Sequence, residues 1–228
     1  MELIATLIFL SSGLFLGWSL GANDASNVFG TAVGSRMVRF STAAFICSIF
    51  IIIGSVTAGA GAADGLGKLG AVNALAGSFT VALAAAITVL FMTQLGLPVS
   101  TSQAVVGAIV GWNLFSGSTT DINELGKIVS TWVACPILAA IFSAFIYKFI
   151  VLFIENTKPH LLSLDRNIRL ALIIVGAFGS YTLGANNIGN VMGVFVPSSP
   201  FENIKTGIFD ISAVEQLFLL GAIAIAIG

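Results

Sequence analysis

The chain has 228 residues, of which 57% are hydrophobic and only 8% are charged, with a formal net charge of −1 and a mean hydropathy of +1.05. Soluble domains carry roughly 25% charged residues, so this composition excludes an ordinary soluble domain. The balanced charge offers no basic surface for a nucleic acid. Several uncharged stretches exceed the roughly 20 apolar residues that cross a bilayer, and they lack the strict alternation of barrel strands. The sequence therefore predicts an all-α polytopic membrane protein.

The predicted helices follow one another along the whole chain. A first helix is expected over 3–20, with an interruption near 21–27 and a continuation to 34. Further helices are expected over 40–62, 72–95, 99–115 and 127–153. The 99–115 helix is short and follows a turn at Gly96–Pro98, so it is expected to form a hairpin or re-entrant element. After a charged loop over 155–167, a helix is expected from 168 with an interruption near 184–190, and a last one from about 213 to Gly228.

One segment of the chain is repeated. Leu20–Gly30 reads LGANDASNVFG and Leu183–Gly193 reads LGANNIGNVMG, at a constant spacing of 163 positions. Repeated halves whose hydrophobic helices are interrupted at Gly- and Asn-rich points are typical of inverted-repeat secondary transporters. We therefore predict a first repeat over 1–154, a linker over 155–167 and the start of a second repeat over 168–228. A counterpart of Pro98–Gly111 is expected at 261–274, beyond the last residue, so the second repeat is expected to be truncated.

The distribution of charges predicts how the chain is oriented in the membrane. Arg36 and Arg39 occupy one connection without an acidic neighbour, and basic residues also flank the 155–167 loop, whereas the other connections are acidic or balanced. Cytoplasmic loops carry an excess of Lys and Arg, so these two connections are expected in the cytoplasm and the N-terminus outside. An inverted repeat requires the same arrangement, because residue 168 then starts on the side opposite residue 1. The expected location is the plasma membrane.

The first copy of the repeated segment contains an acidic residue in an otherwise uncharged environment. A carboxylate at the bilayer centre costs about 2.5–3.5 kcal/mol on insertion scales, so Asp24 is expected to face a cavity and bind a cation. The alternative is a shallow Asp24 that caps the continuing helix. Asparagines in both copies of the repeated segment offer neutral oxygens for binding a cation, and these are Asn23, Asn27, Asn186, Asn187 and Asn190. The alternative is that these asparagines link neighbouring helices by hydrogen bonds.

A Ser- and Thr-rich segment precedes the short helix. Pro98 ends the preceding helix, and Ser100, Thr101, Ser102 and Gln103 open the next one. Free backbone N–H groups and the positive end of the helix dipole make such a helix start suitable for an anion. The alternative interpretation is simple capping of the helix by one serine.

These segments resemble a known family. Gly21–Ser35 is similar to the signature of the inorganic phosphate transporter (PiT) family, whose members are inverted-repeat symporters of phosphate with sodium or protons, some relatives carrying sulfate. The resemblance implies that Asn23, Asp24, Asn186 and Asn187 hold sodium, and that Asn27, Asn190 and the residues Ser100–Gln103 bind the anion. Two positions depart from the family pattern: Asn187 stands where the second copy usually carries Asp, and Gln103 stands where a His is usual.

The sequence thus favours a sodium-coupled phosphate symporter with no cofactor beyond the coupling ion. A sulfate or proton-coupled permease of the same fold is one alternative, and a non-transporting membrane receptor or assembly subunit is another. An enzyme is not expected, because the single histidine, His160, lies in a loop and the membrane segments contain no paired acids. Phosphate or sulfate, membrane lipid and a second copy in a homo-oligomer are the expected partners, and nucleic acid is not.

Overall fold

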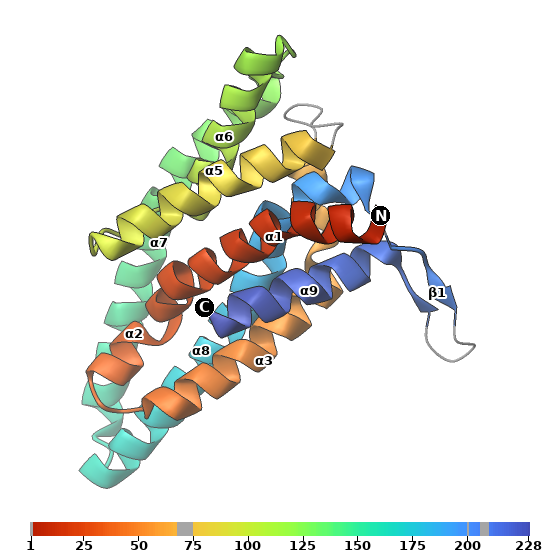
Figure 1. The fold of residues 1–228 in the computed structure, drawn as a ribbon. Coiled ribbons are helices and arrows are strands. Elements are labelled where there is room, and N and C mark those ends of the chain that lie inside the picture. Colours follow the sequence, from red (N-terminus) through yellow and green to blue (C-terminus); the bar gives the residue numbers. More distant parts are fainter. Residues whose placement is uncertain (1, 68–74, 200, 206–209) are drawn as a thin grey trace.

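A computed structural model describes residues 2–67, 75–199, 201–205 and 210–228. The protein is built almost entirely from helices (Figure 1). The helices are α1 (Glu2–Leu20), α2 (Ser26–Gly34), α3 (Phe40–Ala58), α4 (Ala60–Gly67), α5 (Leu75–Gln94), α6 (Thr101–Ser116), α7 (Ile122–Thr157), α8 (Leu161–Met192) and α9 (Ala213–Ile227). A π-helical turn, η1 (Gly21–Ala25), joins α1 to α2, and a 3-10 segment, η2 (Gly193–Ser198), follows α8. The antiparallel strands β1 (Ile204–Lys205) and β2 (Asp210–Ile211) form a small hairpin that the sequence did not predict.

Most predicted helices are present, and two of those in the first 62 residues differ from the prediction. The interruption expected near 21–27 takes the form of the wider π-helical turn η1, not an unwound segment. The helix expected over 40–62 is divided at Gly59 into α3 and α4. The beginning of the helix expected over 72–95 lies outside the described residues, and α5 is described from Leu75.

The interruption predicted near 184–190 is wrong. Helix α8 runs without a break to Met192 and changes to the 3-10 segment η2 only afterwards. The glycines of this stretch serve close packing: a Cβ at Gly184 would overlap the carbonyl oxygen of Ile51, and one at Gly189 would lie 2.6 Å from the carbonyl carbon of Ala62. A glycine tolerated in a helix for the sake of a close backbone contact does not end that helix.

The charged loop predicted over 155–167 is also mostly helical. Helix α7 extends to Thr157 and α8 begins at Leu161, so that three residues connect them. The start of α8 is fixed by His160, whose Nδ1 accepts a hydrogen bond from the backbone N–H of Leu162. Asp121 caps the start of α7 in the same way, by accepting hydrogen bonds from the N–H groups of Asn123 and Glu124. Caps of this kind satisfy the free N–H groups of a first turn, which lets charged residues remain helical outside the apolar stretch.

The helices that carry the two copies of the repeated segment make equivalent glycine contacts. Gly21 of η1 lies against the backbone of Ile225, and Gly184 of α8 lies against that of Ile51. Next to these contacts, Gly228 lies against Trp18 and Gly54 against Tyr181. Gly21 and Gly184 are 163 positions apart, as are Trp18 and Tyr181, while Ile51 and Ile225 are 174 positions apart, as are Gly54 and Gly228.

The spacing of 174 positions is larger than that of 163 because the connection between α8 and α9 is longer than the connection between α2 and α3. The repeat read from the sequence therefore has a counterpart in helix packing, in which α1 contacts α9 and α3 contacts α8. The inverted orientation of the two repeats stays a prediction.

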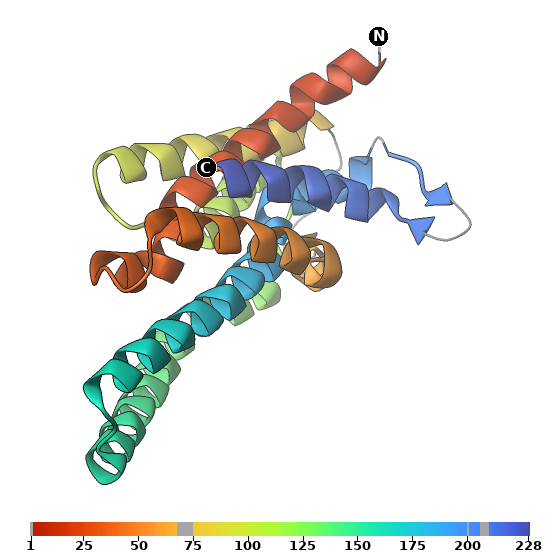
Figure 2. The same ribbon diagram turned by 90° about the horizontal axis from the view of Figure 1, so that it is seen from below.

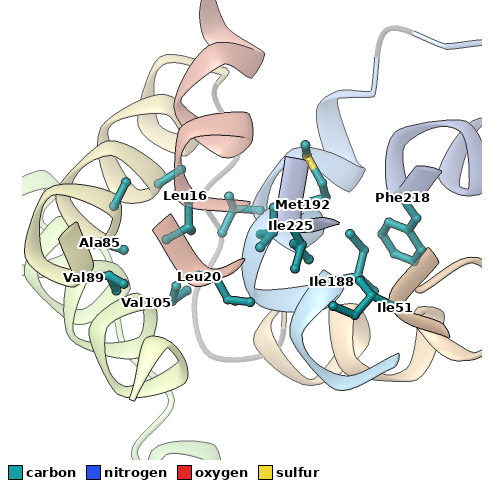
Figure 3. Close-up of a cluster of buried hydrophobic side chains, with 14 of the residues drawn as sticks. Leu16, Leu20, Ile51, Ala85, Val89, Val105, Ile188, Met192, Phe218 and Ile225 are labelled. Carbon is teal, nitrogen blue, oxygen red and sulfur yellow. The ribbon is translucent and has the colours of Figure 1, made fainter. Parts of the chain in front are cut away.

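A buried apolar core connects these helices (Figure 3). Side chains of α1 lie between those of α5 and α6 on one side and those of α8, α9 and α3 on the other; the labelled members are Leu16, Leu20, Ala85, Val89, Val105, Ile188, Met192, Ile225, Phe218 and Ile51. Fully burying a Leu, Ile or Phe side chain contributes about 1.5–3 kcal/mol in water, although helix association within lipid depends more on close packing. The core therefore fixes the position of η1 relative to α6 and α8.

Four helices among the described residues are long and apolar enough to cross a membrane, namely α3, α5, α7 and α8 extended into η2. Helix α7 carries apolar side chains over most of its length and none of its residues is buried. Together with the first part of α8 it extends away from the other helices (Figure 2). Apolar surface of this extent is expected to be covered by lipid or by other membrane helices, which identifies an integral membrane protein.

Candidate ion- and anion-binding site

The start of α6 is positioned by a tight turn after α5. Gly96 has a left-handed conformation with φ of +69°, which a glycine adopts without steric cost, and the N–H of Leu97 donates to the carbonyl of Met92 at 3.0 Å. Pro98 has no N–H to continue α5. The Ser100 hydroxyl then caps α6 by accepting a hydrogen bond from the N–H of Gln103 at 3.3 Å. Thr101 and Ser102 are therefore held in the first turn of α6.

Thr101 connects this turn to the first copy of the repeated segment. Its hydroxyl donates a hydrogen bond to Asp24 Oδ2 at 3.3 Å, across 77 positions of sequence. Thr101 is buried and Asp24 is partly exposed. The residue predicted for the cation and the segment predicted for the anion are therefore neighbours, and their roles in binding stay predictions.

Ser102 connects the same turn to the second copy. The side-chain amide of Asn190 on α8 donates to Ser102 Oγ at 2.8 Å and to Asn187 Oδ1 at 3.0 Å, while the Asn187 amide donates to the carbonyl of Leu183 at 3.1 Å. Asn187 and Asn190 are both buried. Two adjacent residues of α6 thus contact both copies of the repeated segment.

Asn23 adds a third connection between η1 and the α5–α6 turn. Its amide lies 2.7 Å from the Thr93 hydroxyl, 3.1 Å from Asp24 Oδ1 and 3.2 Å from the Val99 carbonyl oxygen. Thr93 is a part of this cluster that sequence reasoning missed. The available signal was a hydroxyl one turn before Gly96, where α5 delivers the chain to the Pro98–Gln103 segment.

Three residues predicted for the site lie away from this cluster. Asn27 is exposed, and its amide donates only a 3.4 Å hydrogen bond to the Asn23 carbonyl among the described contacts. Asn186 is exposed as well, because successive residues of a regular helix point about 100° apart and Asn187 takes the inward position. The side chain of Gln103 is exposed, and its contribution to the described hydrogen bonds comes from the backbone N–H.

A separate cavity of about 600 Å³ lies on the other side of η1, between α2, α3 and the end of α9. Its lining is mainly apolar and includes Ala22 and Ser26, but neither Asn23 nor Asp24. At the second copy of the repeated segment the corresponding surface is covered, because Gly189, 163 positions after Ser26, packs against α4. The polar cluster, not this cavity, is therefore the candidate binding site.

Comparison with solved structures shows the class of this fold. The protein resembles the structure titled the sodium-dependent phosphate transporter with a TM-score of 0.76 at 21% identity, over 97% of this chain and 74% of that one. The two proteins thus share one fold, that of a helical membrane protein. Residues 20–228 match the model of the phosphate transporter family, and the chain belongs to that family.

Individual relatives agree with this assignment. The chain is 31% identical over 184 residues to a Pyrococcus abyssi protein that carries the provisional name phosphate permease, covering 75% of this chain and 45% of that one. It is 30% identical over 201 residues to a sulfate permease of Bacillus subtilis, covering 86% of this chain and 54% of that one. The chain therefore spans about half the length of the curated relatives it matches.

Proposed function

We propose that this protein takes part in secondary active transport of inorganic phosphate coupled to sodium. The observation that carries the proposal is the pair of hydrogen bonds from one turn of α6, Thr101 to Asp24 and Asn190 to Ser102. A residue that could bind a cation and a helix start that could bind an anion are joined directly. Binding of one ion then changes the surroundings of the other, which is what symport requires.

The cation is proposed to bind at Asp24 with neutral oxygens from Asn23 and, in the second copy, from Asn187. Asp24 is only partly buried and carries the negative charge that a sodium ion would neutralise. Asn186, also assigned to this role from the sequence, points outward in the present arrangement, so its participation requires a movement of α8 or a further partner.

The anion is proposed to bind at the start of α6. Hydroxyl groups of Ser100, Thr101 and Ser102 lie there together with free backbone N–H groups at the positive end of the helix dipole. Asn190 would add an amide donor by giving up its 2.8 Å hydrogen bond to Ser102 Oγ, whereas Asn27 and Gln103 are exposed in this arrangement. A sodium ion at Asp24 would offset the negative charge of an anion bound this close to the carboxylate.

Sulfate is the second candidate substrate. The similarity to the Bacillus subtilis sulfate permease favours it, and phosphate and sulfate are both tetrahedral anions that the same N–H and hydroxyl donors can bind. Proton coupling has less support from the residues, because Gln103 offers no titratable group where the family usually has His. The plasma membrane and an N-terminus outside are part of the proposal.

The test is uptake and binding by the purified chain in proteoliposomes. Radiolabelled phosphate uptake is measured with an inward sodium gradient and with choline in its place, and sulfate is added as a competitor. We expect saturable, sodium-dependent uptake that Asp24→Asn nearly abolishes while expression and membrane insertion persist. Equal uptake in choline would refute sodium coupling, uptake of sulfate but not phosphate would favour the second candidate, and binding without uptake would favour a receptor.

A further inference from the structure

The side-chain amide of Asn23 is surrounded by oxygen atoms. The distances are 2.7 Å to Thr93 Oγ1, 3.1 Å to Asp24 Oδ1 and 3.2 Å to the Val99 carbonyl oxygen. Only 7% of Asn23 is exposed, so water cannot readily replace these partners. A carboxylate and a carbonyl can only accept hydrogen bonds, whereas a hydroxyl can donate or accept. Whether the nitrogen or the oxygen of the Asn23 amide faces Asp24 therefore depends on whether a cation is bound beside them.

Two orientations of the amide are compatible with these positions. In the first, the Asn23 nitrogen donates to Asp24 and to Val99, and the Asn23 oxygen accepts a hydrogen bond from Thr93. This orientation satisfies every group without an ion. In the second, the nitrogen donates to Thr93, and the Thr93 hydrogen goes to the Val89 carbonyl at 2.7 Å. Three oxygens then face one another, from Asn23, Asp24 and Val99, and with Asp24 ionised such a group is stable only around a cation.

We propose that Thr93 is a positioning residue for cation binding, because its hydroxyl is a partner for the Asn23 amide in both orientations. When no cation is present it donates to the Asn23 oxygen. When a cation is present it accepts from the Asn23 nitrogen and holds the oxygen toward Asp24 and Val99. This inference rests on the proposed function, since it assumes that the cation binds at Asp24.

The structure separates this role from general helix packing. Thr93 and Thr88 both lie on α5, and each hydroxyl donates to the carbonyl four residues earlier, at 2.7 Å and 2.8 Å. Thr88 is exposed and bonds to no other side chain among the described residues, whereas Thr93 reaches Asn23 across 70 positions of sequence. Thr88→Val is therefore a matched control for Thr93→Val, with the same chemical change in the same helix.

The experiment measures sodium binding by the purified full chain directly, with radioactive sodium, and phosphate KM at saturating sodium in proteoliposomes. Thr93→Val is expected to raise the half-saturating sodium concentration about fivefold to tenfold, because an amide that loses its hydrogen-bond partner no longer holds its oxygen toward the ion. Thr93→Ser should remain within about twofold of the unchanged chain, as should the phosphate KM of all variants. If Thr93→Val cannot be recovered, Thr93→Ala removes the same hydroxyl with less bulk.

The outcomes distinguish this inference from the proposed function. The unchanged chain, Thr93→Val and Thr88→Val could all bind sodium with the same affinity. That result would overturn the role of Thr93 and leave the symport proposal standing. Failure of Thr93→Ser to restore sodium affinity, or an equal rise in sodium half-saturation and phosphate KM, would also overturn it. Absence of sodium binding in the unchanged chain would overturn both.

Discussion

The contact between α3 and α8 at Gly184 leaves no room for a side chain, which makes a sharp stability prediction. A Cβ at Gly184 would overlap the carbonyl oxygen of Ile51 and lie 2.9 Å from its carbonyl carbon. The three nearest atoms it would meet all belong to the backbone of Ile51, so no change of rotamer can relieve the overlap. Gly184→Ala therefore forces the two helices apart.

The magnitude follows from two opposing effects. Overpacking a close contact costs about 1–3 kcal/mol, while replacing Gly by Ala inside a helix contributes about 1 kcal/mol of stability. Because the overlap at Gly184 is with backbone that cannot turn aside, the upper part of the first range, about 2–3 kcal/mol, applies. Subtracting the gain of about 1 kcal/mol leaves a net destabilisation of about 1–2 kcal/mol, or a Tm lower by about 2–8 °C for a chain of this size. Gly126→Ala on α7 is the control, because no atom lies within 4 Å of a Cβ there.

The assay is thermal unfolding in detergent followed by tryptophan fluorescence. The Tm of Gly184→Ala should fall, and that of Gly126→Ala should stay constant or rise slightly. Gly54→Ala repeats the test from the other helix, since its Cβ would overlap the carbonyl oxygen of Tyr181. Equal Tm values for Gly184→Ala and Gly126→Ala would show that α3 and α8 do not pack through these glycines.

Three further predictions concern the polar cluster. Thr101→Val should raise the apparent KM for the anion about tenfold or more, because a sodium ion on Asp24 would release the Thr101 hydroxyl to donate to the anion, and losing a donor to a charged group costs about 1.5–3 kcal/mol. An unchanged KM in uptake assays would contradict its role at the anion site. Ser102→Ala and Asn190→Ala should be non-additive in a double-mutant cycle of Tm, with a coupling energy of about 0.6 kcal/mol, and strict additivity would argue against the 2.8 Å hydrogen bond. Asn187→Asp places a carboxylate oxygen where an amide now donates to the Leu183 carbonyl at 3.1 Å, and two acceptor oxygens repel each other. The Tm of this variant should therefore fall in choline chloride and recover in sodium chloride, where a sodium ion can bind the carboxylate. Equal Tm values in the two salts would show that no cation reaches this position.

Much of this architecture follows from the sequence alone. Long uncharged runs leave the helix as the structure that satisfies its own backbone in lipid, so the membrane helices could be predicted from composition. The repetition of LGAN at Leu20 and Leu183 marked the two segments that meet α6, and Pro98 followed by Ser100 marked where α6 begins. These features depend on local backbone chemistry and on spacing, which a sequence records directly.

Other features depend on contacts between distant segments, which only the tertiary structure decided. Gly184 and Gly189 looked like a helix interruption, but they are contact points for α3 and α4, because a glycine has the same sequence signature in both roles. Asn186 and Asn187 are neighbours in sequence, yet only Asn187 faces Asn190, since the rotation of α8 is set by its packing. Thr93 resembled any hydroxyl in an apolar helix until the fold brought it within 2.7 Å of Asn23, because a hydrogen bond across 70 positions depends on how α1 and α5 pack.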